Sequence, residues 1–170
     1  SYTYTVKSGT IPTGLILNQT EGRLIGVPTQ SGSYTFTIES KDSKNHTGEK
    51  QYTIEIYPAL TINTSSVTTN WTRGITYPLA VVTASGGFSG NYLFSMNSTN
   101  GLSIDSTGKI TGKPLTAGTF TYTIQVEDER GFKSSKELII TINEEPKITL
   151  TDLVIYLEKG GEYKLTSTGG

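Results

Sequence analysis

The chain has 170 residues, 34% of them hydrophobic, and its 14 basic and 15 acidic side chains give a net charge of −1. This balance provides no basic surface for nucleic acid or for an anionic membrane. The sequence contains no cysteine, which excludes disulfides, thiolate catalysis and cysteine-ligated metals, and it has no apolar run near the roughly 20 residues of a transmembrane helix.

The first third of the chain shows the alternation of strands that bury one face. The alternating positions are Tyr34, Phe36 and Ile38 in one strand and Tyr52, Ile54 and Ile56 in the next. Turn-forming sequences, TQSGS and DSKNHTGE, bound these strands. Because no segment carries a helical stripe and tyrosine and threonine are frequent, the sequence predicts an all-β fold.

The same pattern returns further along the chain, where Phe120, Tyr122 and Ile124 alternate in the same way. A constant spacing of 86 residues relates Gly22 to Gly108, Gly26 to Gly112, Pro28 to Pro114, Asp42 to Asp128 and Ile54 to Ile140. This spacing is too long for a solenoid, whose repeats have about 20 to 50 residues. It fits a small sandwich domain of about 100 residues, so we predict tandem β-sandwich repeats.

The segments GLILNQTEGRLIGVPTQSGSYTFTIESKDS and GLSIDSTGKITGKPLTAGTFTYTIQVEDERG resemble the immunoglobulin-like, cadherin-like tandem repeats of bacterial surface proteins, of the adhesin-stalk type. The resemblance implies immunoglobulin-like β-sandwiches of about 86 residues that act as spacers or adhesive stalks outside the cell. One departure concerns the closing turn, because the first repeat has DSKNHTG where Asp-x-x-Gly is expected. This departure weakens any transfer of a calcium role to the first repeat.

The two repeats begin at different points of the shared pattern. The second, residues 58–143, opens with ALTINTSSVTTNWTRGITYPLAVVTASGG, whereas the first, residues 1–57, begins at SYTYTVKSG and lacks these opening strands. Residues 144–170 match the missing opening, and Gly169-Gly170 align with Gly86-Gly87. We therefore expect residues 144–170 to be the opening strands of a third repeat. The NEEP linker is short, which favours completion of residues 1–57 of a neighbouring chain, head to tail through residues 146–170. Completion within one chain stays open.

The main candidate for a ligand site is a calcium site. Acidic side chains near the end of the second repeat could gather at a junction and supply the oxygen ligands that this ion prefers; they are Glu127, Asp128, Glu129, Glu144, Glu145 and Asp152. The first junction, IYPALTI, contains no acidic residue. This one-sided supply argues for solvated acidic turns, so no metal ligand is assigned.

Other polar and aromatic candidates are isolated. His46, the one histidine, lies in a polar turn, where a general base would need a partner and a pocket. Trp71 lies near the presumed join of the two repeats, where packing is favoured over stacking on a sugar. Five Asn-x-Ser/Thr sequences, whose glycosylation stays open, begin at Asn18, Asn45, Asn63, Asn70 and Asn97.

These features predict a structural and adhesive repeat module of a long extracellular cell-surface protein that extends a binding tip from the cell. The alternative is a carbohydrate- or protein-binding accessory module of a secreted protein, which a planar row of exposed aromatic side chains would favour. We expect no enzyme and no cofactor, because the sequence has no metal-spaced histidine pair, phosphate-binding loop or nucleophile elbow. The expected partners are adjacent copies of the same repeat; a host or glycan ligand stays unspecified, and no nucleic acid or membrane span is expected.

Overall fold

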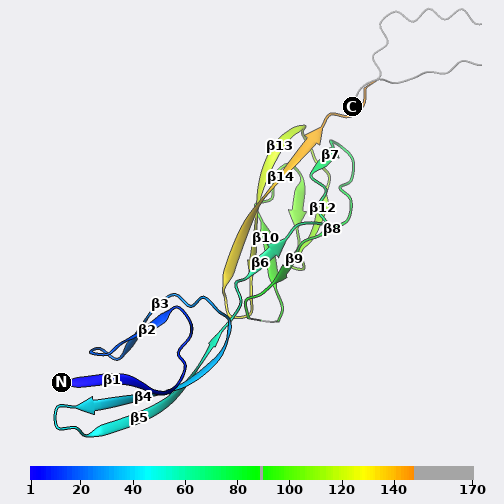
Figure 1. Ribbon diagram of the computed structural model, residues 1–170. Coiled ribbons are helices and arrows are strands. Elements are labelled where there is room, and N and C mark those ends of the chain that lie inside the picture. The colour runs from blue at the N-terminus through cyan, green and yellow to red at the C-terminus, as the bar shows by residue number, and fades with distance from the viewer. Residues whose placement is uncertain (89, 148–170) are drawn as a thin grey trace, which may run out of the picture. The chain divides into compact units, whose positions relative to one another are not determined.

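The structure is a computed structural model that describes residues 1–88 and 90–147, and these ranges consist of strands, turns and loops (Figure 1). Within them, no helix is long and apolar enough to cross a membrane. The chain divides into two compact units. The first contains Ser1–Leu60 and Gly86–Phe88, and the second contains, among the described residues, Thr61–Ser85 and residues 90–147.

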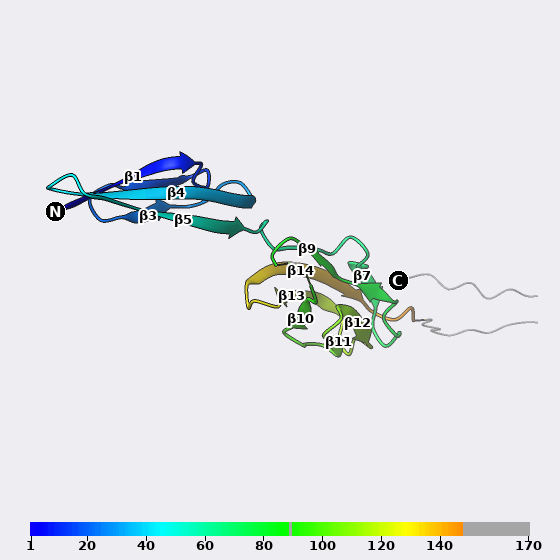
Figure 2. The same ribbon diagram turned by 90° about the horizontal axis from the view of Figure 1, so that it is seen from below.

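The first unit has two layers, a three-stranded sheet and a two-stranded hairpin (Figure 2). Its strands are β1 (Tyr2–Gly9), β2 (Leu15–Asn18), β3 (Arg23–Gly26), β4 (Gly32–Asp42) and β5 (Thr47–Ile56). The sheet has the order β1-β4-β5 with antiparallel neighbours, and β2 pairs with β3. Alternation along β4 turns Tyr34, Phe36 and Ile38 toward the hairpin side, as the sequence predicted.

The second unit is a sandwich with more strands. They are β6 (Thr61–Asn63), β7 (Asn70–Thr72), β8 (Ala80–Val81), β9 (Thr83–Ser85), β10 (Leu93–Met96), β11 (Leu102–Ile104), β12 (Lys109–Gly112), β13 (Gly118–Glu127) and β14 (Lys133–Asn143). One sheet has the order β10-β13-β14-β7, with β7 parallel to β14. A second sheet has the order β11-β12-β8, and β6 pairs with β9.

The five strands of the first unit recur in the second unit with the same register. Gly32 faces Ile56 across β4 and β5, and Gly118 faces Ile142 across β13 and β14. The β1–β4 and β10–β13 pairs agree in the same way. The strands formed by residues 61–85, from β6 to β9, have no counterpart among the described strands of the first unit.

The boundary between the two compact units does not coincide with the boundary between the two sequence repeats. Residues 86–88 belong to the first unit, where the Gly87 N–H donates to the Pro58 carbonyl (2.7 Å) and the Phe88 ring contacts Tyr57 edge-on, with centroids 5.2 Å apart. The second compact unit therefore starts at Thr61, three residues after the position at which the sequence pattern places the second repeat.

The backbone geometry explains why both repeats have glycine in the G-x-P segment. Gly26 and Gly112 end β3 and β12 with φ angles of 119° and 130°, a region that residues with a side chain rarely adopt. A Cβ at either position would also collide with the carbonyl oxygen of the glycine that precedes the neighbouring strand, Gly14 or Gly101. Close approach of the two backbones thus requires glycine in both repeats.

The closing turn is the same in both units despite its different sequence. Asp128 Oδ1 accepts the N–H groups of Arg130 (2.9 Å) and Phe132 (3.0 Å), and Asp42 Oδ1 accepts those of Lys44 (2.8 Å) and His46 (2.9 Å). The position with positive φ is Gly131 in the second unit and Asn45 in the first. Asparagine tolerates this left-handed conformation better than most residues, which explains how DSKNHTG replaces Asp-x-x-Gly.

The core of the second unit contains side chains from residues 61–85 as well as from the long strands. Tyr122, Ile124 and Val126 on β13 are 0% exposed. The segment between residues 61 and 85 contributes the buried side chains Ile62, Val67, Tyr77, Ala80 and Val82. Residues from the start of the repeat are therefore as much a part of this core as the long strands that carry the repeated pattern.

Candidate functional site

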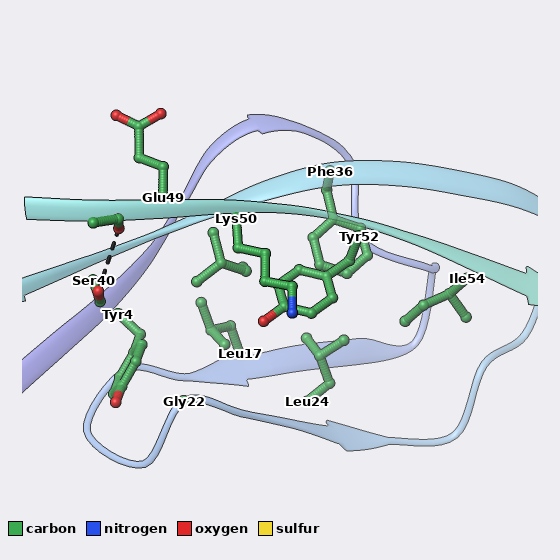
Figure 3. A pocket seen from close by; sticks show the side chains of 12 residues that line it. Tyr4, Leu17, Gly22, Leu24, Phe36, Ser40, Glu49, Lys50, Tyr52 and Ile54 are labelled. Atoms are coloured by element: carbon green, nitrogen blue, oxygen red, sulfur yellow. Dashed lines mark hydrogen bonds between the residues drawn. The ribbon is translucent and has the colours of Figure 1, made fainter.

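The first unit contains a cavity of about 550 Å³ between its sheet and its hairpin (Figure 3). Leu17 and Leu24 of the hairpin point toward Phe36, Lys50 and Tyr52 of the sheet. A further seven residues complete the lining: Tyr4, Gly22, Ile38, Ser40, Gly48, Glu49 and Ile54. The cavity follows directly from strand alternation, which directs the same face of β4 and β5 inward.

Aromatic side chains give the cavity its most defined surface. The rings of Phe36 and Tyr52 stack with centroids 6.0 Å apart and an angle of 27° between their planes. Lys50 lies on the same face of β5, and its Nζ is 5.4 Å from the centroid of the Tyr52 ring, a cation–π contact. These residues offer an apolar surface with a single cationic group beside it.

The opposite face of the same sheet is polar. Glu49 turns its carboxylate away from the cavity and forms an ion pair with Lys7, whose Nζ also lies 3.5 Å from Glu39 (Figure 3). The hydrogen bond to Glu49 raises the pKa of the Lys7 ammonium above its usual range. Thr35 and Thr53 share a hydrogen bond across the strands, with their hydroxyl oxygens 3.0 Å apart. This face therefore has the character of a solvated surface.

Equivalent positions in the two units differ in burial. Tyr52 is 43% exposed, whereas Leu138, its counterpart, is 6% exposed. Several other positions lining the cavity are half-buried although their counterparts are buried: Leu24 against Ile110, Ile38 against Ile124, Ser40 against Val126 and Ile54 against Ile140. Since the registers agree, the difference comes from the additional strands of the second unit. The sequence indicated an exposed apolar face here and placed Tyr52 on the alternating face of its strand, but it did not single out Lys50.

The acidic residues considered for calcium do not gather. Glu127, Asp128 and Glu129 lie at the turn between β13 and β14, whereas Glu144 and Glu145 follow the far end of β14. The 11 residues of β14 separate these groups by about 34 Å. The gathering that the sequence left open therefore does not occur for these five residues, because the hairpin places the two clusters at opposite ends of the unit.

Each acidic group has another partner. Glu127 forms an ion pair with Lys133 (3.1 Å), Glu129 accepts the Asn91 N–H (3.1 Å), and Glu144 forms an ion pair with Arg73 (3.2 Å). Asp152 lies outside the described residues. Within the described ranges, no three His, Cys, Asp or Glu side chains are arranged to hold a metal ion.

The isolated candidates have local structural roles. His46 Nδ1 lies 3.0 Å from Asp42 Oδ2, and this contact is the main cause that lowers the pKa of Asp42. Trp71 lies on β7 beside the last residues of β14, so it is not at the join with the first unit. Its Nε1–H donates to the Ile75 carbonyl (3.1 Å), and its ring contacts Tyr77 edge-on. The expectation that Trp71 packs at that join is therefore wrong.

Four of the five Asn-x-Ser/Thr asparagines use their side-chain oxygen as an acceptor, namely Asn18, Asn63, Asn70 and Asn97. The fifth, Asn45, holds the positive φ of the closing turn. Among the described residues, the exposed aromatic side chains Tyr2, Tyr52 and Phe132 lie on β1, on β5 and in the β13–β14 turn. This distribution does not favour the carbohydrate-binding alternative.

Comparison with protein families bears on both units. A family model described as "Putative Ig domain" matches residues 1–57 and 58–143. The chain belongs to this immunoglobulin-like family. The all-β fold and the tandem repeats of about 86 residues expected from the sequence are thereby confirmed.

The proteins similar to this chain include an adhesin. The chain is 29% identical over 130 residues to the serine-rich adhesin for platelets of Staphylococcus aureus, an alignment that covers 74% of this chain and 6% of the adhesin. The C-terminal 282-residue fragment of intimin, solved in complex with the intimin-binding domain of the translocated intimin receptor, is similar with a TM-score of 0.54 and 22% identity. That alignment covers 84% of this chain and 51% of the fragment, and it shows the fold. Mouse cadherin-23 EC22–24 has 18% identity, a TM-score of 0.43, and coverage of 85% and 54%.

Proposed function

We propose that this chain is a structural and adhesive repeat module of a long extracellular surface protein, in which successive units hold a binding tip away from the cell. The observation that carries the proposal is the presence of two consecutive units of one immunoglobulin-like family with the same strand register. The similarity to an adhesin over 74% of this chain supports an adhesive and extracellular setting.

The path of the chain through the second unit suits a role in extension. Lys136, near the start of β14, donates to the Ile62 carbonyl of β6 (3.3 Å), so the chain enters the unit beside this end of β14. It leaves after Asn143, about 24 Å further along the same strand. A unit that is entered at one end and left at the other adds length with each copy, whereas a unit with adjacent termini would not.

The proposed partners are adjacent copies of the same repeat, joined head to tail through residues 146–170, and a host or glycan ligand held at the tip. The polar outer face of the first unit, with its ion pairs and its threonine pair, is consistent with exposure to solvent along such an array. No step of this proposal requires catalysis or a cofactor.

Antibodies raised against the 170-residue chain test the proposal on cells that produce the parent protein. We expect labelling of intact cells without permeabilisation, and loss of the label after external protease treatment. Deleting one pair of repeats from the parent should weaken attachment to a host surface while the tip is retained. Labelling only after permeabilisation would contradict the surface location. Binding of the purified chain to host cells, with attachment unaffected by the deletion, would favour the binding-module alternative.

A further inference from the structure

The turn that precedes β11 contains the one Asn-Gly pair of the sequence, Asn100-Gly101. We propose that Asn100 is a conformation-gated modification site. Its side-chain amide is protected from deamidation while the loop of residues 113–117 is bound to it, and it is converted without an enzyme when the loop opens. The inference concerns the second unit alone and does not depend on the proposed function.

The fold requires this residue pair at the turn. The N–H of Leu102 donates to the Thr99 carbonyl (3.1 Å), and the two residues between them, Asn100 and Gly101, have positive φ angles of 49° and 75°. Asn followed by Gly is a favoured sequence for a turn with two such residues. A Cβ at Gly101 would also collide with the Lys113 carbonyl oxygen. The turn therefore fixes glycine directly after Asn100.

Glycine after asparagine favours deamidation, because no Cβ hinders the approach of its backbone nitrogen. In this reaction the Gly101 nitrogen bonds to Asn100 Cγ and closes a succinimide ring. The Cγ–Nδ2 bond breaks, and the Nδ2 group leaves as ammonia with the proton from the Gly101 N–H. Water then opens the ring at either carbonyl and leaves aspartate or isoaspartate at position 100. Ring closure requires the nitrogen and Cγ to meet in a defined orientation, so Asn100 must be free to rotate.

The folded second unit holds the Asn100 side chain in place. Its Oδ1 accepts the N–H groups of Leu115 (3.1 Å) and Thr116 (2.7 Å) and the Thr116 hydroxyl (2.9 Å). Its Nδ2 donates to the Thr116 carbonyl (2.8 Å). All four hydrogen bonds come from one loop, and rotation of the amide toward Gly101 would break them. The rate of conversion is therefore set by the fraction of time for which this loop is open.

Conversion weakens the contact that protects the site. A carboxylate has no N–H group, so the Thr116 carbonyl would face an acceptor in place of its donor. Isoaspartate would also lengthen the backbone of the turn by one carbon. The first unit has Thr13-Gly14 at the equivalent turn, with φ of 92° at Gly14, and threonine has no amide to lose. The modification is thus specific to the second unit.

The first test follows deamidation of the intact chain in mildly alkaline buffer, with and without guanidinium chloride, by mass spectrometry of proteolytic peptides. In denaturant, Asn100 should convert before the other asparagines. In native buffer its conversion should be slower by about tenfold or more. A synthetic peptide of residues 96–104 in both buffers corrects for the effect of the denaturant on the chemistry. Equal corrected rates, or earlier conversion of another asparagine in the denatured chain, would overturn the proposal.

A pair of threonine variants tests the gating. Thr116→Val removes the hydroxyl that donates to Asn100 and keeps the backbone hydrogen bonds of the loop. It should accelerate native conversion by about 2- to 10-fold and leave the rate in denaturant unchanged. Thr121→Val, at an exposed position of β13, is the matched control and should have no effect. Both are compared where tryptophan fluorescence shows the second unit folded. Equal native rates for the two variants would refute gating by this loop.

A third variant, Asn100→Asp, reproduces one of the two products. It should lower the urea midpoint of the second unit by about 0.5 to 1 M, because the Thr116 carbonyl loses its donor. Wild-type chain that has been deamidated in denaturant and refolded should show a lowered midpoint in proportion to its conversion. An unchanged midpoint in both samples would contradict the proposed weakening of the loop contact.

Discussion

Two neighbouring isoleucines of β14 provide a strict test of the sandwich register. Ile140 is 1% exposed, whereas Ile139 is 56% exposed on the other face of the strand. Replacing Ile140 by alanine removes three buried carbons, worth about 2.4 kcal/mol at about 0.8 kcal/mol each. The cavity left behind raises the expected loss of unfolding free energy to about 3 to 4 kcal/mol. Ile139→Ala loses the same atoms and the same β-branching but should cost less than about 1 kcal/mol.

The single tryptophan makes the assay specific for one unit. Trp71 lies on β7, which pairs with the end of β14, so its fluorescence reports unfolding of the second unit without a contribution from the first. With a urea slope of about 1.5 kcal/mol/M, Ile140→Ala should lower the unfolding midpoint by about 2 M or slightly more, at an unchanged slope. Ile139→Ala should shift the midpoint by well under about 1 M.

If the register is wrong, Ile139→Ala should be the destabilising variant and Ile140→Ala the neutral one. A shift of the strand by one residue would turn Ile139 inward and Ile140 outward. A larger loss for Ile139→Ala than for Ile140→Ala would therefore refute the assigned register. Equal losses for the two variants would refute the conclusion that β14 has one buried and one exposed face.

Three further predictions concern the same unit. Gly112→Ala should cost about 2 kcal/mol or more in urea unfolding, since the position has positive φ and a Cβ would collide with the Gly101 carbonyl; a neutral effect would contradict this. Burial raises the pKa of Tyr77 to about 12, so its stabilisation is complete below about pH 10 and is lost as pH rises to about 12. Thermal unfolding of Tyr77→Phe should lack this alkaline decline. The hydroxyl of Thr107 lowers the pKa of Asp105 below its ordinary 3.8, so its contribution is present above that value and is lost in acid. Asp105→Asn should flatten the decline below about pH 4, and an unchanged acid limb would rule out this carboxylate.

The strand faces could be predicted from alternation alone. Phe36 is 2% exposed and Tyr122 is 0% exposed, and each lies at the centre of a stretch that alternates apolar residues with threonine or other polar residues. Periodicity of two determines a face once the strand exists, and the constant spacing of 86 residues transfers the assignment from one repeat to the other. The apolar lining of the cavity follows for the same reason.

Contacts that depend on hairpin length could not be predicted. Glu127 and Glu144 are 17 positions apart in sequence, and only the long β13–β14 pairing shows that a whole strand separates them. Trp71 presents the same difficulty, because β7 joins the sheet as a parallel neighbour of the end of β14. Parallel pairing of distant segments leaves no local pattern in the sequence. The inward position of Tyr52 followed from alternation with Ile54, but its 43% exposure did not, because its counterpart Leu138 is buried at 6% exposure.

The difference between the two units separates what the repeated motif encodes from what completes the fold. The family match and the shared register include residues 1–57 as well as residues 58–143, although the two units bury equivalent side chains to different extents. The motif therefore encodes the strand pairs and their turns, including the glycine at the end of β3 and β12. Closure depends on residues such as Ile62, Tyr77 and Val82, which precede the motif and belong to β6–β9 or to the loops between them. In an array of such units, the segment between one motif and the next would thus complete the core of a unit. The apolar residues of this segment must then match the core that they fill.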